Sequence, residues 1–175
     1  MQPNPIYNVM IVDDHHAVRN ALSTVILTND NMELAAVATN GQQAIQLCKE
    51  VQPDIVLMDI RMPQMDGIEA TQTILAEQPH IIICALTSFL EPELIQGMMQ
   101  AGASGYLLKD LSAEELTTAI RSACTGQSVL DKEAYRILFG QSKPSNMQPL
   151  VTSCAAKRHS VDHMFQRDRQ IPSGI

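Results

Sequence analysis

The sequence predicts an α/β fold in which a doubly wound, five-stranded parallel sheet carries helices on both faces. Short apolar runs alternate with amphipathic helical patterns over the first 126 residues, which is typical of such a sheet. Each run is rich in Val, Ile, Leu or Met and short enough for a strand that is buried on both faces. With 175 residues, 45% of them hydrophobic, the chain has room for one such domain and an extension.

Five strands are expected from the apolar runs, and the third and fourth have the composition of central strands. Their ranges are Asn8–Val12, Glu33–Ala38, Asp54–Met58, Ile81–Leu86 and Gly105–Leu108. Because consecutive parallel strands need a crossover connection, a helix is expected between each pair.

The intervening segments carry helical signals. Apolar stripes with helical spacing are formed by Val18, Leu22, Val25 and Ile26 and by Leu116, Ile120 and Ala123. Ser112 and Glu115, three residues apart, form a capping box. Asn40 can cap a helix that begins at Gly41, and Pro92 suits a first helical position.

The end of the chain differs from the rest in charge and in pattern. Residues 1–142 hold 7 basic and 17 acidic residues, whereas residues 143–175 hold 5 and 2. The segment Asp131–Phe139 has the pattern of one short helix, but Gly140–Pro149 is rich in linker residues. We therefore expect a folded domain at 1–127, a linker with room for a short helix at 128–149, and a disordered tail at 150–175.

Composition excludes several classes of protein. No apolar run is long enough for a membrane span, so we expect a soluble, cytoplasmic protein without a membrane partner. Affinity for DNA comes largely from basic side chains, so the excess of acidic residues does not support DNA as a partner. Cys48, Cys84, Cys124 and Cys154 are far apart and lack zinc-site spacing, which favours reduced, mostly buried thiols.

Chemistry is expected where the strands end, because ligands of open parallel sheets bind outside the carboxyl ends of the strands. Asp13 and Asp14 follow the first strand, Asp59 the third, Thr87 the fourth and Lys109 the fifth. Two carboxylates about 4 Å apart repel by roughly 4 kcal/mol at an effective dielectric constant near 20, so the cluster requires cations. Mg²⁺ and Lys109 are the expected ones.

The expected substrate is a phosphoryl group. Mg²⁺ takes oxygen ligands and keeps several waters, which leaves positions for phosphate oxygens. An aspartate carboxylate can act as the nucleophile in phosphoryl transfer, and Asp59 is the candidate by position.

Four motifs carry a family resemblance: VDD at 12–14, LMDIRMPQMDG at 57–67, ALT at 85–87 and GASGYLLK at 102–109. Together they resemble the response-regulator receiver domain of two-component systems over about residues 7–126. The resemblance implies a flavodoxin-like (βα)5 domain with strand order 2-1-3-4-5. The segment GYLLKDLSAEEL at 105–116, with DDH at 13–15, more narrowly resembles the NarL/FixJ subfamily, whose receivers normally precede a LuxR-type helix-turn-helix.

The resemblance also implies roles for the residues of the site. Asp59 would be the phospho-acceptor, modified to an aspartyl phosphate by a sensor histidine kinase. Asp14 and Asp59 would bind Mg²⁺ directly, Asp13 through water, and the backbone carbonyl of Arg61 would complete the site. Lys109 would pair with the phosphate.

The family implies a phosphorelay switch rather than an enzyme, although one that autophosphorylates from small phospho-donors and slowly dephosphorylates itself. Thr87 would move toward the phosphate and Tyr106 would rotate into the vacated space. The face formed by the fourth helix, fifth strand and fifth helix would then change, with homodimerisation on phosphorylation as one open consequence.

The output of the switch is the open part of the interpretation. The residues after the linker show no helical apolar stripe, so a helix-turn-helix output domain is expected to be missing. We favour signalling through protein contacts. The alternative is a DNA-binding transcription regulator of the LuxR-type family, with an output domain that is truncated or frameshifted.

Two further points bear on the site. Asp110 follows Lys109 where many receivers have a proline after a cis bond, and a non-proline cis bond costs about 3 to 4 kcal/mol. The sequence therefore leaves open whether the Lys109–Asp110 peptide bond is cis or trans. His15 and His16 point about 100° apart on a helix and are predicted not to be metal ligands.

A flavin carrier and an aspartyl-phosphate hydrolase are rival functions, but the acidic first loop and the position of Asp59 disfavour them.

Overall fold

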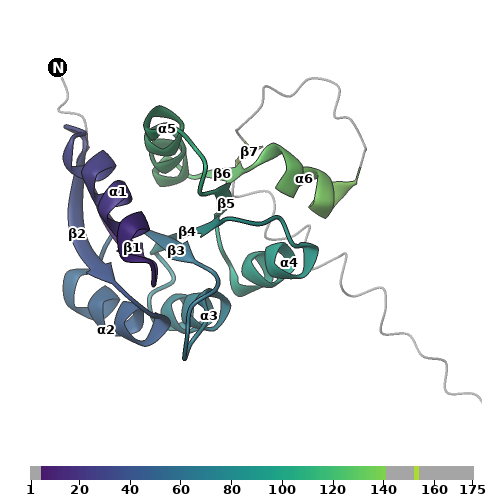
Figure 1. Cartoon of the computed structure of the whole chain (residues 1–175), viewed down its shortest axis with the longest axis horizontal. Coiled ribbons are helices and arrows are strands. Elements are labelled where there is room, and N and C mark those ends of the chain that lie inside the picture. The colour runs from purple at the N-terminus through teal and green to yellow at the C-terminus, as the bar shows by residue number, and fades with distance from the viewer. Residues whose placement is uncertain (1–4, 141–151, 154–175) are drawn as a thin grey trace, which may run out of the picture.

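The computed structural model describes residues 5–140 and 152–153. Its sheet has the order β2-β1-β3-β4-β5-β6-β7 (Figure 1). The strands are β1 (Tyr7–Val12), β2 (Met32–Ala38), β3 (Ile55–Asp59), β4 (Ile82–Thr87), β5 (Gly105–Leu108), β6 (Gln127–Leu130) and β7 (Thr152–Ser153). Strands β1 to β6 pair in parallel, and β7 pairs antiparallel with β6.

Helices cover both faces of the sheet, as the alternating pattern predicts (Figure 1). They are α1 (His16–Leu27), α2 (Gly41–Val51), α3 (Gly67–Glu77), α4 (Pro92–Ala101), α5 (Ala113–Cys124) and α6 (Lys132–Phe139). One buried cluster joins the sheet to α2, α3, α4 and α6, and a second joins the other face to α1 and α5.

The central strand β3 shows why its sequence reads as a continuous apolar run. Val56 and Met58 pack in the first cluster, while Ile55 and Leu57 pack in the second, and all four are fully buried. Successive side chains of a strand point to opposite faces, so a strand covered on both sides needs apolar residues at every position.

The predicted helix starts are confirmed. The side chain of Asn40 accepts a hydrogen bond from the backbone N–H of Gln43 and so caps α2. Ser112 and Glu115 form the complete capping box of α5, and Pro92 occupies the first turn of α4.

The prediction of five strands is wrong, because β6 adds a sixth parallel strand beside β5. Only Val129 and Leu130 of its four residues are large and apolar, so the segment lacks a strand signal of its own. Tertiary pairing supplies what the local pattern lacks: Gly105 pairs with Val129, and a Cβ on Gly105 would lie 2.9 Å from the Val129 carbonyl oxygen. The absence of a side chain there lets the sheet continue.

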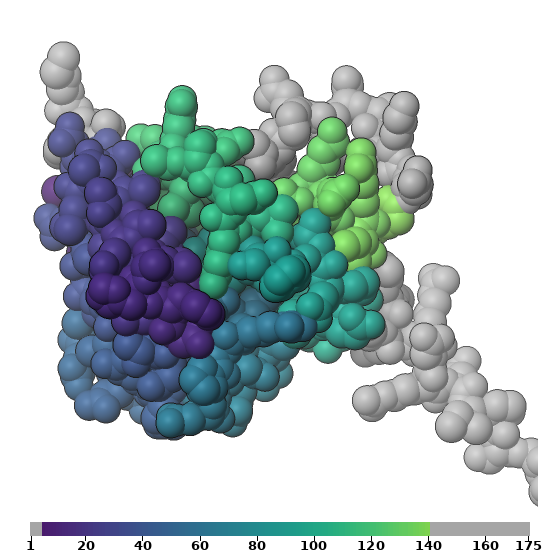
Figure 2. All heavy atoms as spheres, viewed as in Figure 1, coloured from purple at the N-terminus to yellow at the C-terminus, as the bar shows by residue number. Residues whose placement is uncertain are grey.

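Helix α6 occupies the segment in which a short helix was expected, and Asp131 caps it. It packs beside α4 (Figure 2). Its residues extend the apolar layer on that face of the sheet. The predicted disordered tail lies outside the described residues, apart from the two residues of β7.

The part of the chain that the structure describes contains no helix both long and apolar enough to cross a membrane. Cys48 and Cys84 are buried and Cys124 is half-buried, whereas Cys154 lies outside the described residues. Burial raises the pKa of the Cys48 thiol to about 11 and that of Cys124 to about 12, so these two thiols stay protonated at neutral pH.

Candidate functional site

Parallel pairing brings three aspartates together at one edge of the sheet. Asp13 and Asp14 follow β1 directly, and Asp59 is the last residue of β3. The pairing of Val12 with Met58 sets the two strand ends side by side. We call Asp13, Asp14 and Asp59 the carboxylate cluster.

The loop after Asp59 returns tightly to the end of its own strand. The backbone N–H of Gly67 donates to the Ile60 carbonyl at 2.8 Å. A Cβ on Gly67 would lie 2.2 Å from the Asp59 carbonyl oxygen, so only glycine fits at the start of α3. Asp66 caps that helix through the backbone N–H of Glu69. These contacts hold Asp59 against a fixed backbone.

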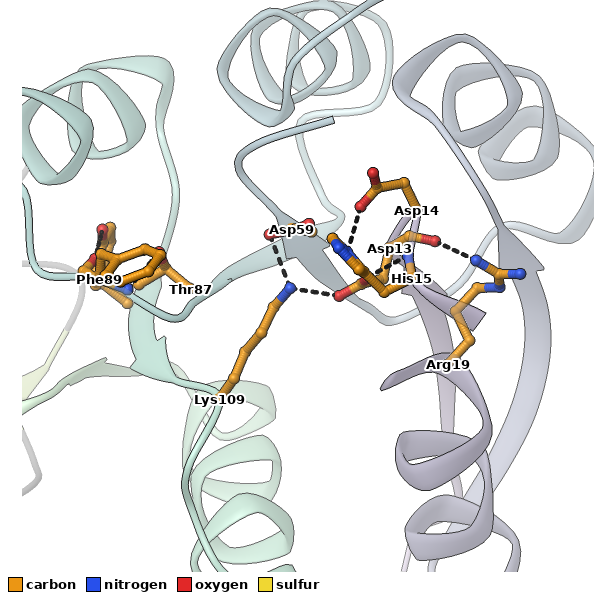
Figure 3. Close-up of polar contacts among 9 residues, drawn as sticks. Asp13, Asp14, His15, Arg19, Asp59, Thr87, Phe89 and Lys109 are labelled. Carbon is orange, nitrogen blue, oxygen red and sulfur yellow. Dashed lines mark hydrogen bonds and ion pairs between the residues drawn. The ribbon is translucent and has the colours of Figure 1, made fainter. Parts of the chain in front are cut away.

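Lys109 bridges two members of the carboxylate cluster. Its Nζ lies 2.6 Å from Oδ2 of Asp13 and 3.0 Å from Oδ1 of Asp59 (Figure 3). Asp13 is 1% exposed, Asp59 is 5% exposed and the Lys109 side chain 14%. A buried charge needs a partner of opposite sign, and here one ammonium serves two carboxylates. The cluster therefore keeps an excess of negative charge.

Burial controls the protonation of these groups. Burial raises the pKa of Asp59 above its usual value, the Lys109 contact opposes this rise, and the charges of Asp13 and Asp14 add to it. Burial alone would lower the pKa of Lys109, but its hydrogen bonds to Asp13 and Asp59 outweigh that effect and leave the pKa raised. Lys109 is therefore a permanent cation at neutral pH, whereas ionised Asp59 is destabilised.

The carboxylate cluster and His15 together form a group that could hold a metal ion. Asp13, Asp14, His15 and Asp59 each offer one ligand atom, and these four atoms lie within 4.8 Å of one another. An octahedral ion with bonds of about 2.1 Å separates opposite ligands by about 4.2 Å, so a small shift would close the four atoms around one ion. The three predicted aspartate ligands thus form a group that could hold a metal.

His15 also belongs to this group of four. That it is not a metal ligand, as its sequence context suggests, stays a prediction. Its Nδ1 lies 2.7 Å from Oδ1 of Asp14 and 3.4 Å from Oδ1 of Asp13. The ring of His16 instead lies 3.4 Å from the Asn20 side chain, one turn along α1. The divergence of the two adjacent histidines excludes a shared ion, but it leaves either one free to join the site. Their adjacency to two aspartates was the available signal.

Thr87 and Tyr106 are the predicted switch residues. Thr87 is the last residue of β4, and Tyr106 lies within β5, where it pairs with Ala85. The Thr87 hydroxyl donates to the Phe89 carbonyl at 3.1 Å, and the Tyr106 hydroxyl donates to the same carbonyl at 3.4 Å. Tyr106 is fully buried, and burial raises the pKa of its hydroxyl. One backbone carbonyl thus joins the two side chains; the dashed contact at Phe89 is visible in Figure 3.

Arg61 is the remaining predicted site residue. Its side chain forms an ion pair with Glu91 at the start of α4. The role of its backbone carbonyl as a ligand stays a prediction. The Lys109–Asp110 peptide bond is trans, since residues 5–140 and 152–153 contain no cis bond.

A model of the response regulator receiver domain matches residues 9–121. The transcriptional regulatory protein LnrK of Bacillus subtilis (strain 168) is 41% identical over 135 residues, which cover 77% of this chain and 61% of LnrK. The response regulator protein VraR of Staphylococcus aureus (strain Mu3) is 38% identical over 125 residues, or 71% of this chain and 60% of VraR. The chain thus spans about three fifths of the length of these relatives.

Among solved structures, a two-component response regulator of the LuxR family from Aurantimonas sp. SI85-9A1 superposes with a TM-score of 0.71. It is 27% identical, and the match covers 88% of this chain and 99% of that one. The similarity therefore extends beyond the sheet of five strands that the motifs span.

Proposed function

Because the chain belongs to the response regulator receiver family, we propose that Asp59 accepts a phosphoryl group from a sensor histidine kinase with the help of Mg²⁺. The observation that carries the proposal is the placement of Asp59. Its carboxylate is buried at the end of the central strand, in contact with Lys109 and beside two further carboxylates. The proposed nucleophile thus lies beside a cation and within a group of residues that could hold a metal ion.

Phosphoryl transfer needs an aligned nucleophile and neutralisation of the transferring oxygens. In the proposed reaction an Asp59 carboxylate oxygen forms a bond to phosphorus, while the bond from phosphorus to the kinase histidine breaks and the imidazole leaves with the electron pair. Lys109 is in place to contact phosphate oxygens, because its Nζ already lies 3.0 Å from the Asp59 carboxylate. When bound, Mg²⁺ neutralises the carboxylates and the charge on the phosphoryl group.

The donor set suits Mg²⁺, which prefers carboxylate and carbonyl oxygens. In the proposed site Asp14 and Asp59 would hold the ion directly, Asp13 would hold it through water, and the backbone carbonyl of Arg61 would complete the protein ligands. These roles follow the family pattern, and the proximity of the three aspartates supports them.

The proposed switch begins at Thr87. A phosphoryl group on Asp59 offers the Thr87 hydroxyl a charged acceptor in place of the Phe89 carbonyl, to which it now donates. Breaking that bond frees the shared acceptor of Tyr106 and alters the loop that leads into α4. The face made by α4, β5 and α5 then changes, and a partner protein or a second copy of the chain reads the change.

Signalling through protein contacts in the cytoplasm is the output that we favour, with the protein as a switch whose aspartyl phosphate also hydrolyses slowly. The alternative is transcription regulation. It is favoured by the names of the relatives, which include a transcriptional regulatory protein and a LuxR-family regulator. Salt-dependent binding of the full chain to a promoter would support this alternative.

The test of the proposed function is incubation with acetyl phosphate and Mg²⁺, followed by intact mass measurement. We expect one phosphoryl adduct on the wild type and none on Asp59→Asn. Asp54→Asn is the matched control, since Asp54 precedes the same strand and its carboxylate accepts hydrogen bonds from the backbone N–H and the side chain of Asn8. An unmodified wild type, or an equal adduct on Asp59→Asn, would overturn the proposal.

A further inference from the structure

His15 lies where a fourth protein ligand of the metal site would be. As the N-cap residue of α1, its backbone N–H donates to Oδ1 of Asp13 at 2.8 Å, which fixes the start of the helix beside the cluster. The imidazole turns back toward Asp14, and Figure 3 shows the ring joined to that carboxylate by a dashed line. The ring is therefore held near the cluster although the side chain is 68% exposed.

Two oxygens lie at ligand-to-ligand spacing from the His15 Nδ1. Neighbouring ligands of an octahedral ion with bonds of about 2.1 Å are about 3 Å apart. The Nδ1 distances to Asp14 and Asp13, 2.7 and 3.4 Å, lie on either side of that value. A carboxylate oxygen and an imidazole nitrogen both carry lone pairs, so such an approach requires a proton or a metal ion between them. With the ring proton on Nε2, the Nδ1 lone pair is free to bind the ion.

Lys109 and His15 contact different oxygens of Asp13. The ammonium binds Oδ2, whereas Oδ1 faces the imidazole. A metal ion on the His15 side can therefore bind the cluster without displacing Lys109. The same arrangement leaves Lys109 on its own side of Asp59 for contact with a phosphoryl group.

The identity of the ligand atom decides which ions a site prefers. Oxygen sites suit Mg²⁺, whereas imidazole suits Zn²⁺ and other late first-row ions. We propose that His15 is a nitrogen ligand of the carboxylate cluster, which then binds Zn²⁺ or Co²⁺ in preference to Mg²⁺. The inference rests on the metal site of the proposed function. It adds that such ions compete with Mg²⁺ for Asp59, the proposed acceptor.

The test measures metal binding directly by titration calorimetry of the full chain with Zn²⁺ and with Mg²⁺. His15→Asn removes the proposed ligand, and His16→Asn is the matched control because that ring lies beside Asn20 instead. All samples carry Cys154→Ser, His159→Asn and His163→Asn, since these three residues of the sequence could bind Zn²⁺ on their own. A second readout is the NMR shift of the His15 ring nitrogens on addition of Zn²⁺.

We expect Zn²⁺ to bind the background protein more tightly than Mg²⁺, and His15→Asn to weaken Zn²⁺ by at least about tenfold. Mg²⁺ affinity should stay within about twofold in His15→Asn, and His16→Asn should change neither ion. Zn²⁺ should also shift the His15 ring nitrogens but not those of His16.

Two failures are distinguishable. If Mg²⁺ binds and the phosphoryl adduct forms, but His15→Asn leaves Zn²⁺ affinity and selectivity unchanged, the inference is overturned and the proposed function stands. If neither ion binds, or if binding is the same in Asp59→Asn, the carboxylate cluster is not a metal site and both proposals lose their basis.

Discussion

The carboxylate cluster and the Thr87–Tyr106 pair lie at the same edge of the sheet but depend on opposite kinds of interaction. At the ends of β1 and β3, three carboxylates face one bridging ammonium, so negative charge is in excess. Just after the end of β4, the uncharged hydroxyls of Thr87 and Tyr106 share the Phe89 carbonyl. The first region stores electrostatic repulsion that a cation or a proton relieves. The second region carries no charge, so it can respond only by rearranging its hydrogen bonds.

Lys109 connects the two regions. Its side chain binds Asp13 and Asp59, while its backbone N–H donates to the Thr87 carbonyl at 2.8 Å. The Asp59 carboxylate is therefore connected to the backbone of Thr87 through the single residue Lys109. In the proposed switch, a change of charge at Asp59 is the input, and rearrangement of the hydrogen bonds of Thr87 and Tyr106 is the response.

The largest effect is expected from Lys109→Met. Removing one partner of a buried charge pair leaves the other unpaired, which typically costs about 3 to 5 kcal/mol. We expect a loss of about 3 kcal/mol in the free energy of unfolding without divalent ions, measured by urea denaturation, and a partial recovery with Mg²⁺. Lys49→Met is the control, since its ion pair with Glu77 is exposed and is worth less than about 1 kcal/mol. Equal losses in the two variants would contradict a charge-dominated cluster.

A smaller effect of opposite sign is expected from Asp59→Asn. The substitution removes a buried charge that is repelled by Asp13 and Asp14, yet asparagine can still accept a hydrogen bond from Lys109. We expect a gain of roughly 1 to 2 kcal/mol in unfolding free energy at neutral pH without Mg²⁺. Destabilisation under the same conditions would show that Lys109 already neutralises the cluster.

The stability gained by Asp59→Asn should depend on pH. Burial raises the pKa of Asp59 in the folded protein, so the stability that protonation of Asp59 contributes is fully present below the unfolded pKa of about 3.9. It is lost as the pH rises through the folded value. The advantage of Asp59→Asn over the wild type should therefore be largest at neutral pH and shrink as the pH falls. A constant difference between the two proteins would contradict the raised pKa.

The smallest effect is expected in the uncharged region. The Tyr106 hydroxyl bond of 3.4 Å is long, so Tyr106→Phe should cost less than about 1 kcal/mol. Burial raises the pKa of this hydroxyl, so ultraviolet titration of the three tyrosines should show one late transition. That transition should vanish in Tyr106→Phe and persist in Tyr7→Phe. Its persistence in both variants would mean that Tyr106 is not the buried hydroxyl.

Much of the fold follows from local pattern, because every strand from β1 to β5 carries its own apolar run. Strand β6 could not be predicted in the same way, since its pairing depends on Gly105, some 20 residues earlier, which admits Val129 at close range. The three aspartates and Lys109 were predicted together because parallel strands end at one edge. The contact of Arg61 with Glu91 joins two loops, and no local sequence pattern predicts it. The place of His15 beside Asp14 could not be predicted from helical spacing, because His15 is the N-cap residue of α1 and its backbone is extended.

Locating the phosphoryl group on the chain tests most directly whether Asp59 is the acceptor. After treatment with acetyl phosphate and Mg²⁺, borohydride reduces an aspartyl phosphate to homoserine, and peptide mapping by mass spectrometry reports its position. We expect homoserine at position 59 alone, at a yield that falls when Mg²⁺ is chelated. Homoserine at position 13 or 14, or none anywhere in a chain that carries the adduct, would contradict the assignment of Asp59.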